Sequence, residues 1–208
     1  MKPMALDLCC GKGGWAKGLL ATGWNVIGVD IEKYEGFPDE AQLILCDVRG
    51  FFPKIKVDLI VASPPCQEFS KRALPFKVFK NLPPPDTSIW EACVNLAKQL
   101  NCPIVIENVC GAQKYMGKAK AHYGSFYLWG DIDFQIPVGK PRKGFVAVKR
   151  GKRGTKGMGG EYERPGFRER AAQIGCKAAR KEFSANAAVI PMDLARAVGE
   201  HFKTSKEQ

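Results

Sequence analysis

The chain has 208 residues, of which 45% are hydrophobic, and its formal net charge is +11. This is enough apolar material for one domain with a sizeable core. No apolar run approaches the roughly 18 residues that a membrane-spanning helix needs, and residues 1–8 lack the pattern of a signal peptide. Composition therefore argues against a membrane protein and predicts a cytoplasmic protein, which we expect to be a monomer.

Short apolar segments alternate with helix-length segments through the first 128 residues. Strands are expected at Met4–Leu8, Asn25–Asp30, 42–46, 57–62, 103–107 and 123–128. Helical periodicity marks Gly14–Ala21 and 87–100, and the sequence Asp86-Thr87-Ser88 offers a cap for the second helix. The alternation predicts an α/β fold with an open, mostly parallel sheet flanked by helices. Such sheets bind ligands at the carboxyl ends of their strands.

The positive charge is concentrated in one late segment. Residues 137–181 contain 14 Lys and Arg but only three Glu, so this segment alone carries the whole excess of +11. Glycines interrupt it, which indicates a loop or arm, and its charge favours a nucleic acid over a merely solvated face. The expected nucleic-acid contacts are Lys149, Arg150, Lys152, Arg153, Arg168 and Arg170. Beyond this arm, residues 191–202 predict an amphipathic helix with Pro191 near its first turn.

A glycine-rich turn joins the first predicted strand to the first helix. In DLCCGKGG, Gly11, Gly13 and Gly14 lie where the backbone can approach a ligand and helix amides can bind a carboxylate or phosphate. A tight turn without a ligand is the alternative. Asp30 ends the next strand about 20 residues later, a position typical of a carboxylate that binds ribose hydroxyls.

A third carboxylate, Asp47, ends the third strand and could accept a hydrogen bond from an adenine amino group. The glycine spacing is not the Gly-x-Gly-x-x-Gly of dinucleotide-binding proteins, so an adenosine ligand smaller than NAD is expected. S-adenosylmethionine is the candidate. The eight cysteines include no Cys-x-x-Cys pair and there are only two histidines, so we expect reduced thiols and no metal site.

The fourth strand leads into the sequence SPPCQEFS. Two prolines stiffen this loop, which could hold Cys66 at a fixed distance from a substrate ring. An aromatic residue at this place is typical of methyltransferases that act on amino groups, whereas a cysteine favours methylation of carbon. A thiolate that adds to carbon 6 of a pyrimidine turns carbon 5 into a nucleophile. The alternative is a packed thiol in a tight turn.

The segments DLCCGKGG, VDIE, CDV, SPPCQEFS and ENV occur in the order found in the DNA (cytosine-5-)methyltransferase family, which the chain resembles over about residues 4–109. ALPFK, LPPPDTS and HYGSFYLWG further resemble the short phage and prophage members. The resemblance implies the Rossmann-like fold of S-adenosylmethionine-dependent methyltransferases, with S-adenosylmethionine as cofactor and DNA as partner.

The same resemblance assigns roles to individual residues. Cys66 corresponds to the nucleophile, and Glu107 to the carboxyl group that contacts ring nitrogen 3 and the amino group of cytosine and, when protonated, activates the ring. A strand-end carboxylate that caps a turn is the alternative for Glu107. The expected cofactor contacts are Asp7, Cys9, Gly11, Gly13, Gly14, Trp15, Asp30, Ile31, Asp47, Val48, Pro64 and Asn186. An ordinary docking helix at the C-terminal end is the alternative for Asn186.

The chain departs from the family pattern at three points. Cys9 replaces the usual phenylalanine after Asp-Leu, the Gln-x-Arg-x-Arg segment has no clean counterpart, and about 75 residues between Val109 and Asn186 are too few for a full target-recognition domain. We expect a catalytic core at 1–136, a nucleic-acid-binding segment at 137–183, and a helix at 184–208 that completes the core. The predicted activity is cytosine-5 methylation of DNA through a covalent cysteine adduct. The alternatives are the same reaction on RNA and a nucleic-acid-binding protein of this fold without turnover.

Overall fold

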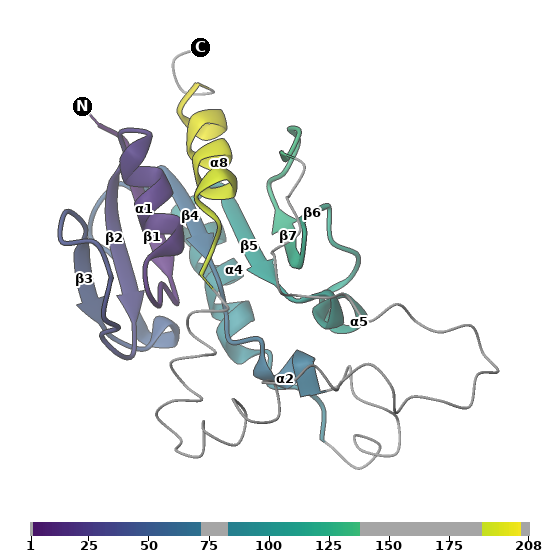
Figure 1. Cartoon of the computed structure of the whole chain (residues 1–208). Coiled ribbons are helices and arrows are strands. Elements are labelled where there is room, and N and C mark those ends of the chain that lie inside the picture. Colours follow the sequence, from purple (N-terminus) through teal and green to yellow (C-terminus); the bar gives the residue numbers. More distant parts are fainter. Residues whose placement is uncertain (1, 72–82, 138–188, 205–208) are drawn as a thin grey trace, which may run out of the picture. The chain divides into compact units, whose positions relative to one another are not determined.

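Seven strands form one mixed sheet in the computed structural model, which describes residues 2–71, 83–137 and 189–204 (Figure 1). The strand order is β3-β2-β1-β4-β5-β7-β6. The strands are β1 Met4–Leu8, β2 Asn25–Asp30, β3 Gln42–Leu45, β4 Leu59–Ala62, β5 Ile104–Asn108, β6 Ala121–Tyr123 and β7 Phe126–Gly130. The first five are parallel, whereas β7 runs antiparallel to both β5 and β6. The prediction of a mostly parallel α/β sheet is confirmed.

Helices follow the strands on both faces of the sheet. They are α1 Gly14–Ala21, α2 Gln67–Lys71, α4 Ser88–Leu100, α5 Gln113–Met116 and α8 Met192–Thr204, with short 3-10 turns η1 Val48–Gly50 and η2 Cys110–Ala112. The N-cap residue of α4 is Thr87, whose side chain makes no capping hydrogen bond, and the Asp86 carboxylate just before it accepts a hydrogen bond from the Ser88 amide at 2.9 Å. The bounds of β1, β2 and α1 agree with those predicted, and the expected helices 87–100 and 191–202 correspond to α4 and α8.

The prediction of a single strand at 123–128 is wrong. The segment is a β-hairpin in which Tyr123 of β6 pairs with Phe126 of β7, so only Gly124 and Ser125 form the turn. Gly124 has φ +60°, in the left-handed region that glycine adopts without strain. The apolar residues on both sides of this short turn read in the sequence as one uninterrupted strand.

Each face of the sheet has its own hydrophobic cluster. On one face, Trp15 and Leu19 of α1 and Leu194 and Val198 of α8 pack against residues such as Val105. On the other face, Trp90, Cys93 and Leu96 of α4 cover Leu6, Ile60 and Ile106. Helices α1 and α8 lie together on their side of the sheet, as Figure 1 shows. A Cβ atom on Gly18 of α1 would lie 2.3 Å from the Ala195 Cβ of α8, so glycine permits this close helix contact.

Candidate functional site

The ends of four parallel strands bring the expected site residues to one edge of the sheet. In the strand register, Leu8 of β1 is opposite both Val29 of β2 and Ala62 of β4, and Ala62 is opposite Ile106 of β5. The next residues along these strands are Cys9, Asp30, Ser63 and Glu107. In Figure 1 the arrowheads of β4 and β5 point toward the end of the sheet at which α2 lies.

Strand alternation places three carboxylates on one face of this edge. Ala5, Val26 and Val105 belong to the cluster beneath α1 and α8. Successive side chains of a strand point to opposite faces, so the side chains of Asp7, Asp30 and Glu107, at even spacings from these residues, also project toward the α1 face. Three acidic side chains thus project to the α1 face near the carboxyl ends of β1, β2 and β5.

The glycine-rich turn leaves room for a ligand at Gly11. Gly11 has φ +51°, and a Cβ atom built on it would have no neighbour within 4 Å, so its backbone borders open space. Its amide donates a hydrogen bond of 2.9 Å to Asp30 Oδ2, which fixes the carboxylate against the turn. Gly13 and Gly14 face protein instead: their Cβ atoms would lie 2.6 Å from Pro38 and 2.5 Å from the Ile190 backbone nitrogen. Only Gly11 of the three borders an opening among the described residues.

Asp7 lies inside the protein directly beneath this turn. The Ala16 amide donates a hydrogen bond of 3.1 Å to its Oδ2, whereas its Oδ1 has no hydrogen-bond partner among the described residues. Burial raises the pKa of the Asp7 carboxyl group well above its ordinary value, with Asp30 adding to the rise and the Ala16 amide opposing it. An unpaired buried oxygen is costly, so a donor from a bound molecule would stabilise it.

The other residues expected to contact the cofactor differ in their solvent exposure. Ile31, next to Asp30, is 69% exposed and is one of several large apolar side chains at the surface, so a flat ring could contact it. Trp15 is 1% exposed and donates its indole N–H to Ser63 Oγ at 3.0 Å, and Val48 is likewise buried. Trp15 and Val48 therefore support the site from the core.

Cys9 turns away from the edge. Its φ of +55° breaks the strand alternation, and its side chain packs against the α4 cluster. A hydrogen bond to the Cys93 thiol of α4, followed by burial, raises the pKa of Cys9. We expected Cys9 as a cofactor contact, and in this structure its thiol faces Cys93.

Asp47 is already engaged by a neighbouring cation. Arg49 donates its backbone amide and its Nε to Asp47 Oδ1 at 2.9 and 3.0 Å, and its guanidinium also binds Oδ2. The side-chain bond from Arg49 is the main cause that lowers the pKa of Asp47 to about 2. The predicted contact with an adenine amino group would have to share or displace these bonds. Sequence reasoning assigned no role to Arg49.

Three hydrogen bonds fix the loop between β4 and α2. The Ser63 amide donates to Leu8 O of β1 at 3.0 Å, and the Ser63 hydroxyl accepts the bond from Trp15 described above. The Asn108 side-chain amide donates to Pro64 O at 2.9 Å, and Asn108 is 1% exposed. The loop is therefore anchored to β1, α1 and β5 immediately before Cys66. The sequence motif ENV included Asn108, but nothing in the sequence alone identified Pro64 as its partner.

Cys66 begins the helix that follows this loop. Its carbonyl accepts the Phe69 and Ser70 amides of α2 at 3.1 and 2.9 Å, and its side chain is half-buried. Burial raises the pKa of the Cys66 thiol; a hydrogen bond to Ser70 lowers it, and the charge of Glu107 raises it further. The thiol and the Glu107 carboxylate are thus within electrostatic reach of one another, and Glu107 is 9% exposed.

The remaining predictions lie outside the described residues. These are Asn186 and the six cations Lys149, Arg150, Lys152, Arg153, Arg168 and Arg170. Pro191, just before α8, is described, and its carbonyl accepts the Ala195 amide at 3.0 Å. In the ranges that the structure covers, no three His, Cys, Asp or Glu residues are grouped as metal ligands. No helix in these ranges is long and apolar enough to cross a membrane.

Neither a protein-family model nor a curated protein matches the chain. Among solved structures, it is similar to an E. coli prophage protein assigned as a DNA modification methyltransferase, with 21% identity, 56% of this chain covered and a TM-score of 0.43. It is also similar to a triple mutant of Spodoptera frugiperda DNMT2, with 26% identity, 54% coverage and a TM-score of 0.38. The matched part spans 35% and 37% of the length of these two chains.

A third similar structure is a Burkholderia thailandensis 1,6-didemethyltoxoflavin-N1-methyltransferase with bound S-adenosylhomocysteine. It has 13% identity and a TM-score of 0.37, and the match covers 62% of this chain and 54% of that chain. The order β3-β2-β1-β4-β5-β7-β6, with β7 antiparallel and helices on both faces, is the Rossmann-like fold of S-adenosylmethionine-dependent methyltransferases. The predicted fold class is confirmed.

Proposed function

We propose that this protein methylates carbon 5 of cytosine in DNA, with S-adenosylmethionine as methyl donor and Cys66 as nucleophile. The observation that carries the proposal is the pairing of Cys66 with Glu107. The Asn108–Pro64 hydrogen bond connects the loop that precedes Cys66 to β5, the strand that contains Glu107. The negative charge of Glu107 also raises the pKa of the Cys66 thiol. Both lie at the sheet edge that also presents Asp30 and Gly11.

The residues at the glycine-rich turn fit S-adenosylmethionine. Gly11 borders open space, Asp7 Oδ1 is a buried acceptor without a partner among the described residues, and Ile31 presents an exposed apolar surface. Each oxygen of Asp30 accepts one backbone amide, from Gly11 or Glu32, and retains a lone pair for a ribose hydroxyl. When bound, the cofactor supplies an electrophilic methyl group.

The reaction that we propose proceeds through a covalent adduct. The target cytosine leaves the base stack, because an enzyme cannot reach carbon 5 and carbon 6 of a base inside the duplex. Glu107 binds ring nitrogen 3 and the amino group, and the Cys66 thiolate forms a bond to carbon 6. Carbon 5 would then form a bond to the methyl group while the bond between that group and the cofactor sulfur breaks, which would leave S-adenosylhomocysteine. Loss of the carbon 5 proton and of the Cys66 sulfur restores the aromatic ring and frees the enzyme.

The test is capture of the adduct on substituted DNA. A duplex with 5-fluorocytosine lacks the proton that must leave, so the wild-type protein should form a stable protein–DNA complex in the presence of S-adenosylmethionine. Cys66→Ser should form none and transfer no labelled methyl group, while its cofactor binding by calorimetry stays within about twofold. Cys102→Ser, a change at a half-buried thiol just before β5, is the matched control. Normal turnover by Cys66→Ser would refute the assignment.

Parallel reactions with RNA decide between the two substrates. A reduced recognition region is also compatible with a structured RNA that is bound by shape. Methyl transfer to RNA but not to DNA would replace DNA with RNA in the proposal. Binding of nucleic acid without any methyl transfer would favour the alternative, a nucleic-acid-binding protein of this fold that has no catalytic activity. The missing Gln-x-Arg-x-Arg segment is the reason for considering this alternative.

A further inference from the structure

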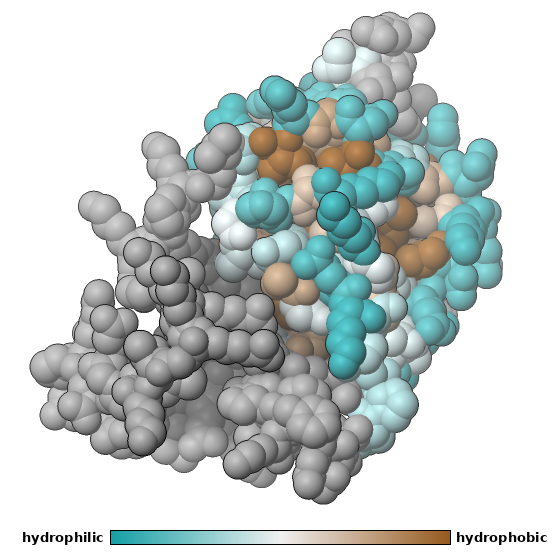
Figure 2. All heavy atoms as spheres, turned by 90° about the vertical axis from the view of Figure 1, so that its right-hand side faces the viewer, coloured by the Kyte–Doolittle hydropathy of each residue, from teal (hydrophilic) through white to brown (hydrophobic). Residues whose placement is uncertain are grey.

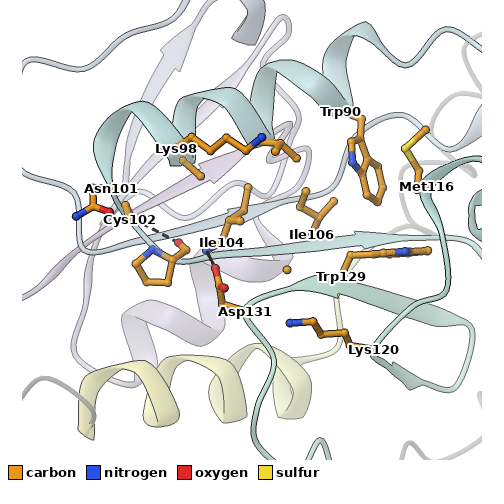
Figure 3. A pocket seen from close by; sticks show the side chains of 14 residues that line it. Trp90, Lys98, Asn101, Cys102, Ile104, Ile106, Met116, Lys120, Trp129 and Asp131 are labelled. Atoms are coloured by element: carbon orange, nitrogen blue, oxygen red, sulfur yellow. Dashed lines mark hydrogen bonds between the residues drawn. The ribbon is translucent and has the colours of Figure 1, made fainter.

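Two adjoining hollows of about 700 and 600 Å³ lie on the α4 face of the sheet, and Figure 3 shows the larger one. In the part of the chain that the structure describes, their charged lining consists of Lys98 and Lys120 with Glu91 and Asp131, so positive and negative charges balance. On the side of the molecule seen in Figure 2, hydrophilic residues surround small, separate apolar patches. Neither feature selects a ligand by its charge or by a broad apolar surface.

Ser70 lies one helical turn after Cys66, at the start of α2. The Ser70 amide donates a hydrogen bond to Cys66 O at 2.9 Å, so the two residues are at positions i and i+4 of a helical turn, where side chains are neighbours. Phe69, between them, is 2% exposed and packs in the core, whereas Ser70 is exposed. The Ser70 hydroxyl is therefore on the open side of α2, next to the half-buried Cys66 thiol.

The first turn of α2 is fixed from both sides. The loop before it is anchored to β1, α1 and β5 by the hydrogen bonds described above. Within the turn, the ring centroids of Phe69 and Tyr115 are 6.0 Å apart, and a Cβ atom on Gly111 would lie 2.9 Å from Phe69 O. The turn after β5 thus packs closely on α2, and Ser70 is held beside Cys66 by the protein itself.

The Ser70 side chain forms a hydrogen bond with the Cys66 thiol. A serine in a helix often bonds instead to the carbonyl group four residues earlier. Here that carbonyl oxygen, Cys66 O, already accepts the amides of Phe69 and Ser70 at 3.1 and 2.9 Å, and it has only two lone pairs. The hydroxyl is therefore left for the sulfur.

The bond from Ser70 opposes the other effects on the thiol. Burial, which is the largest effect, and the charge of Glu107 raise the pKa of Cys66, whereas the side-chain hydrogen bond to Ser70 and the backbone amide of Cys66 lower it. The other titratable groups on the short elements that pack against α2 are the Cys110 thiol of η2 and Lys114 of α5. A thiolate beside a carboxylate requires a donor, and Ser70 supplies one.

We propose that Ser70 is a positioning residue for the nucleophile: its hydroxyl donates a hydrogen bond to the Cys66 sulfur and stabilises the thiolate that attacks the base, an inference that rests on the proposed function. The thiol proton passes to water, and the Ser70 hydroxyl keeps its own proton, so it acts as a donor and not as a base. When the sulfur binds carbon 6 its negative charge is lost, and the bond from Ser70 weakens. The bond strengthens again as the adduct breaks and the thiolate leaves.

The test follows alkylation of Cys66 by iodoacetamide from pH 7.5 to 10.5 in the protein without ligands. Ser70→Ala removes the hydroxyl, Ser70→Thr retains it, and Ser125→Ala, at an exposed serine of the β6–β7 turn, is the matched control. Tryptic cleavage after Lys56 and Lys71 gives a peptide whose single cysteine is Cys66, so mass spectrometry distinguishes it from the other cysteines.

The loss of one donor should reduce the thiolate population of Cys66 and slow its alkylation at pH 7.5 by about 3–10-fold in Ser70→Ala, after allowance for the greater nucleophilicity of a more basic thiolate. The difference should shrink as the pH rises, because the thiol ionises in both proteins. Ser70→Thr should restore the wild-type profile, and Ser125→Ala should not change it. Methyl transfer by Ser70→Ala should fall by a similar factor at pH 7.5 and recover in part at higher pH.

Three outcomes would overturn the role of Ser70. The first is a wild-type alkylation profile in Ser70→Ala; if nucleic-acid binding also weakened, the exposed hydroxyl would contact the substrate instead. The second is a loss by the same factor at every pH, which would indicate reduced access to the thiol. The third is a Ser70→Thr variant that behaves as Ser70→Ala does. Alkylation requires neither nucleic acid nor cofactor, so the hydrogen bond and the proposed methyl transfer can fail independently.

Discussion

The buried hydrogen bond between Asn108 and Pro64 offers the sharpest test of how the loop before Cys66, the proposed nucleophile, is positioned. Asn108→Ala removes the side-chain donor to Pro64 O, and also the acceptor that takes the Val109 amide at 2.9 Å. A buried polar group left without a partner costs about 1–3 kcal/mol. Losing these two hydrogen bonds together should therefore lower the free energy of unfolding by about 2–3 kcal/mol. This corresponds to a fall in melting temperature of about 4–12 °C.

The expected effect on activity is larger than the effect on stability. Asn108 is the tie between the Cys66 loop and β5, and a displacement of about 1 Å at a reacting group can cost about 100-fold in rate. We therefore expect methyl transfer to fall about 100-fold at a temperature at which the variant is fully folded. Binding of S-adenosylmethionine, measured by calorimetry, should change little because Asp30 and Gly11 are untouched.

A second buried hydrogen bond of the same length provides the control. The Trp24 indole donates to Gly199 O of α8 at 2.9 Å, on the face of α1 and α8. Trp24→Phe removes this donor, so it should lower stability by a comparable amount and leave methyl transfer at the wild-type rate. If both variants lose activity in proportion to their stability, or if Asn108→Ala retains full activity, Asn108 does not position the loop.

Three further predictions concern single residues. Asp30→Ala should weaken S-adenosylmethionine binding by roughly one to two powers of ten, because a charge-assisted bond worth about 1.5–3 kcal/mol is lost; unchanged calorimetry would contradict this. Glu107→Gln should abolish methyl transfer. It should also speed the alkylation of Cys66 by iodoacetamide at pH 8, because removing the charge of Glu107 lowers the pKa of the thiol. Slower alkylation would count against an interaction between Glu107 and Cys66. Gly18→Ala should destabilise the protein by about 1–3 kcal/mol in chemical denaturation because its Cβ meets Ala195; an unchanged midpoint would show that α8 can shift.

Local sequence signals were sufficient to predict the elements on either side of the glycine-rich turn. The bounds of β1, α1 and β2 follow from clear apolar patterns closed by glycine turns or by Asp30. The same signals were insufficient at the β6–β7 hairpin. There, Gly124 and Ser125 separate two short apolar strands, and a turn of two residues leaves almost no polar interruption to detect.

The candidate site was predicted as a set of residues but not as a set of contacts. Strand ends alone bring Asp30, Ser63 and Glu107 to one edge, and that follows from a parallel sheet. The bonds that fix them join residues far apart in the chain, such as Asn108 with Pro64 and Trp15 with Ser63. Such pairs depend on which helix packs on which strand, and one sequence contains no local signal for that.

The resting state of Cys66 suggests when the nucleophile is formed. Burial and the charge of Glu107 both raise the pKa of this thiol, so without substrate it is mainly protonated and resists oxidation and alkylation. Its reactivity should keep rising with pH where that of an ordinary cysteine, with a pKa of about 8.5, levels off. Once Glu107 is protonated, its charge no longer raises the pKa of the Cys66 thiol. In the mechanism that we propose, protonated Glu107 binds cytosine, so the thiolate of Cys66 would form most readily in the complex with that base.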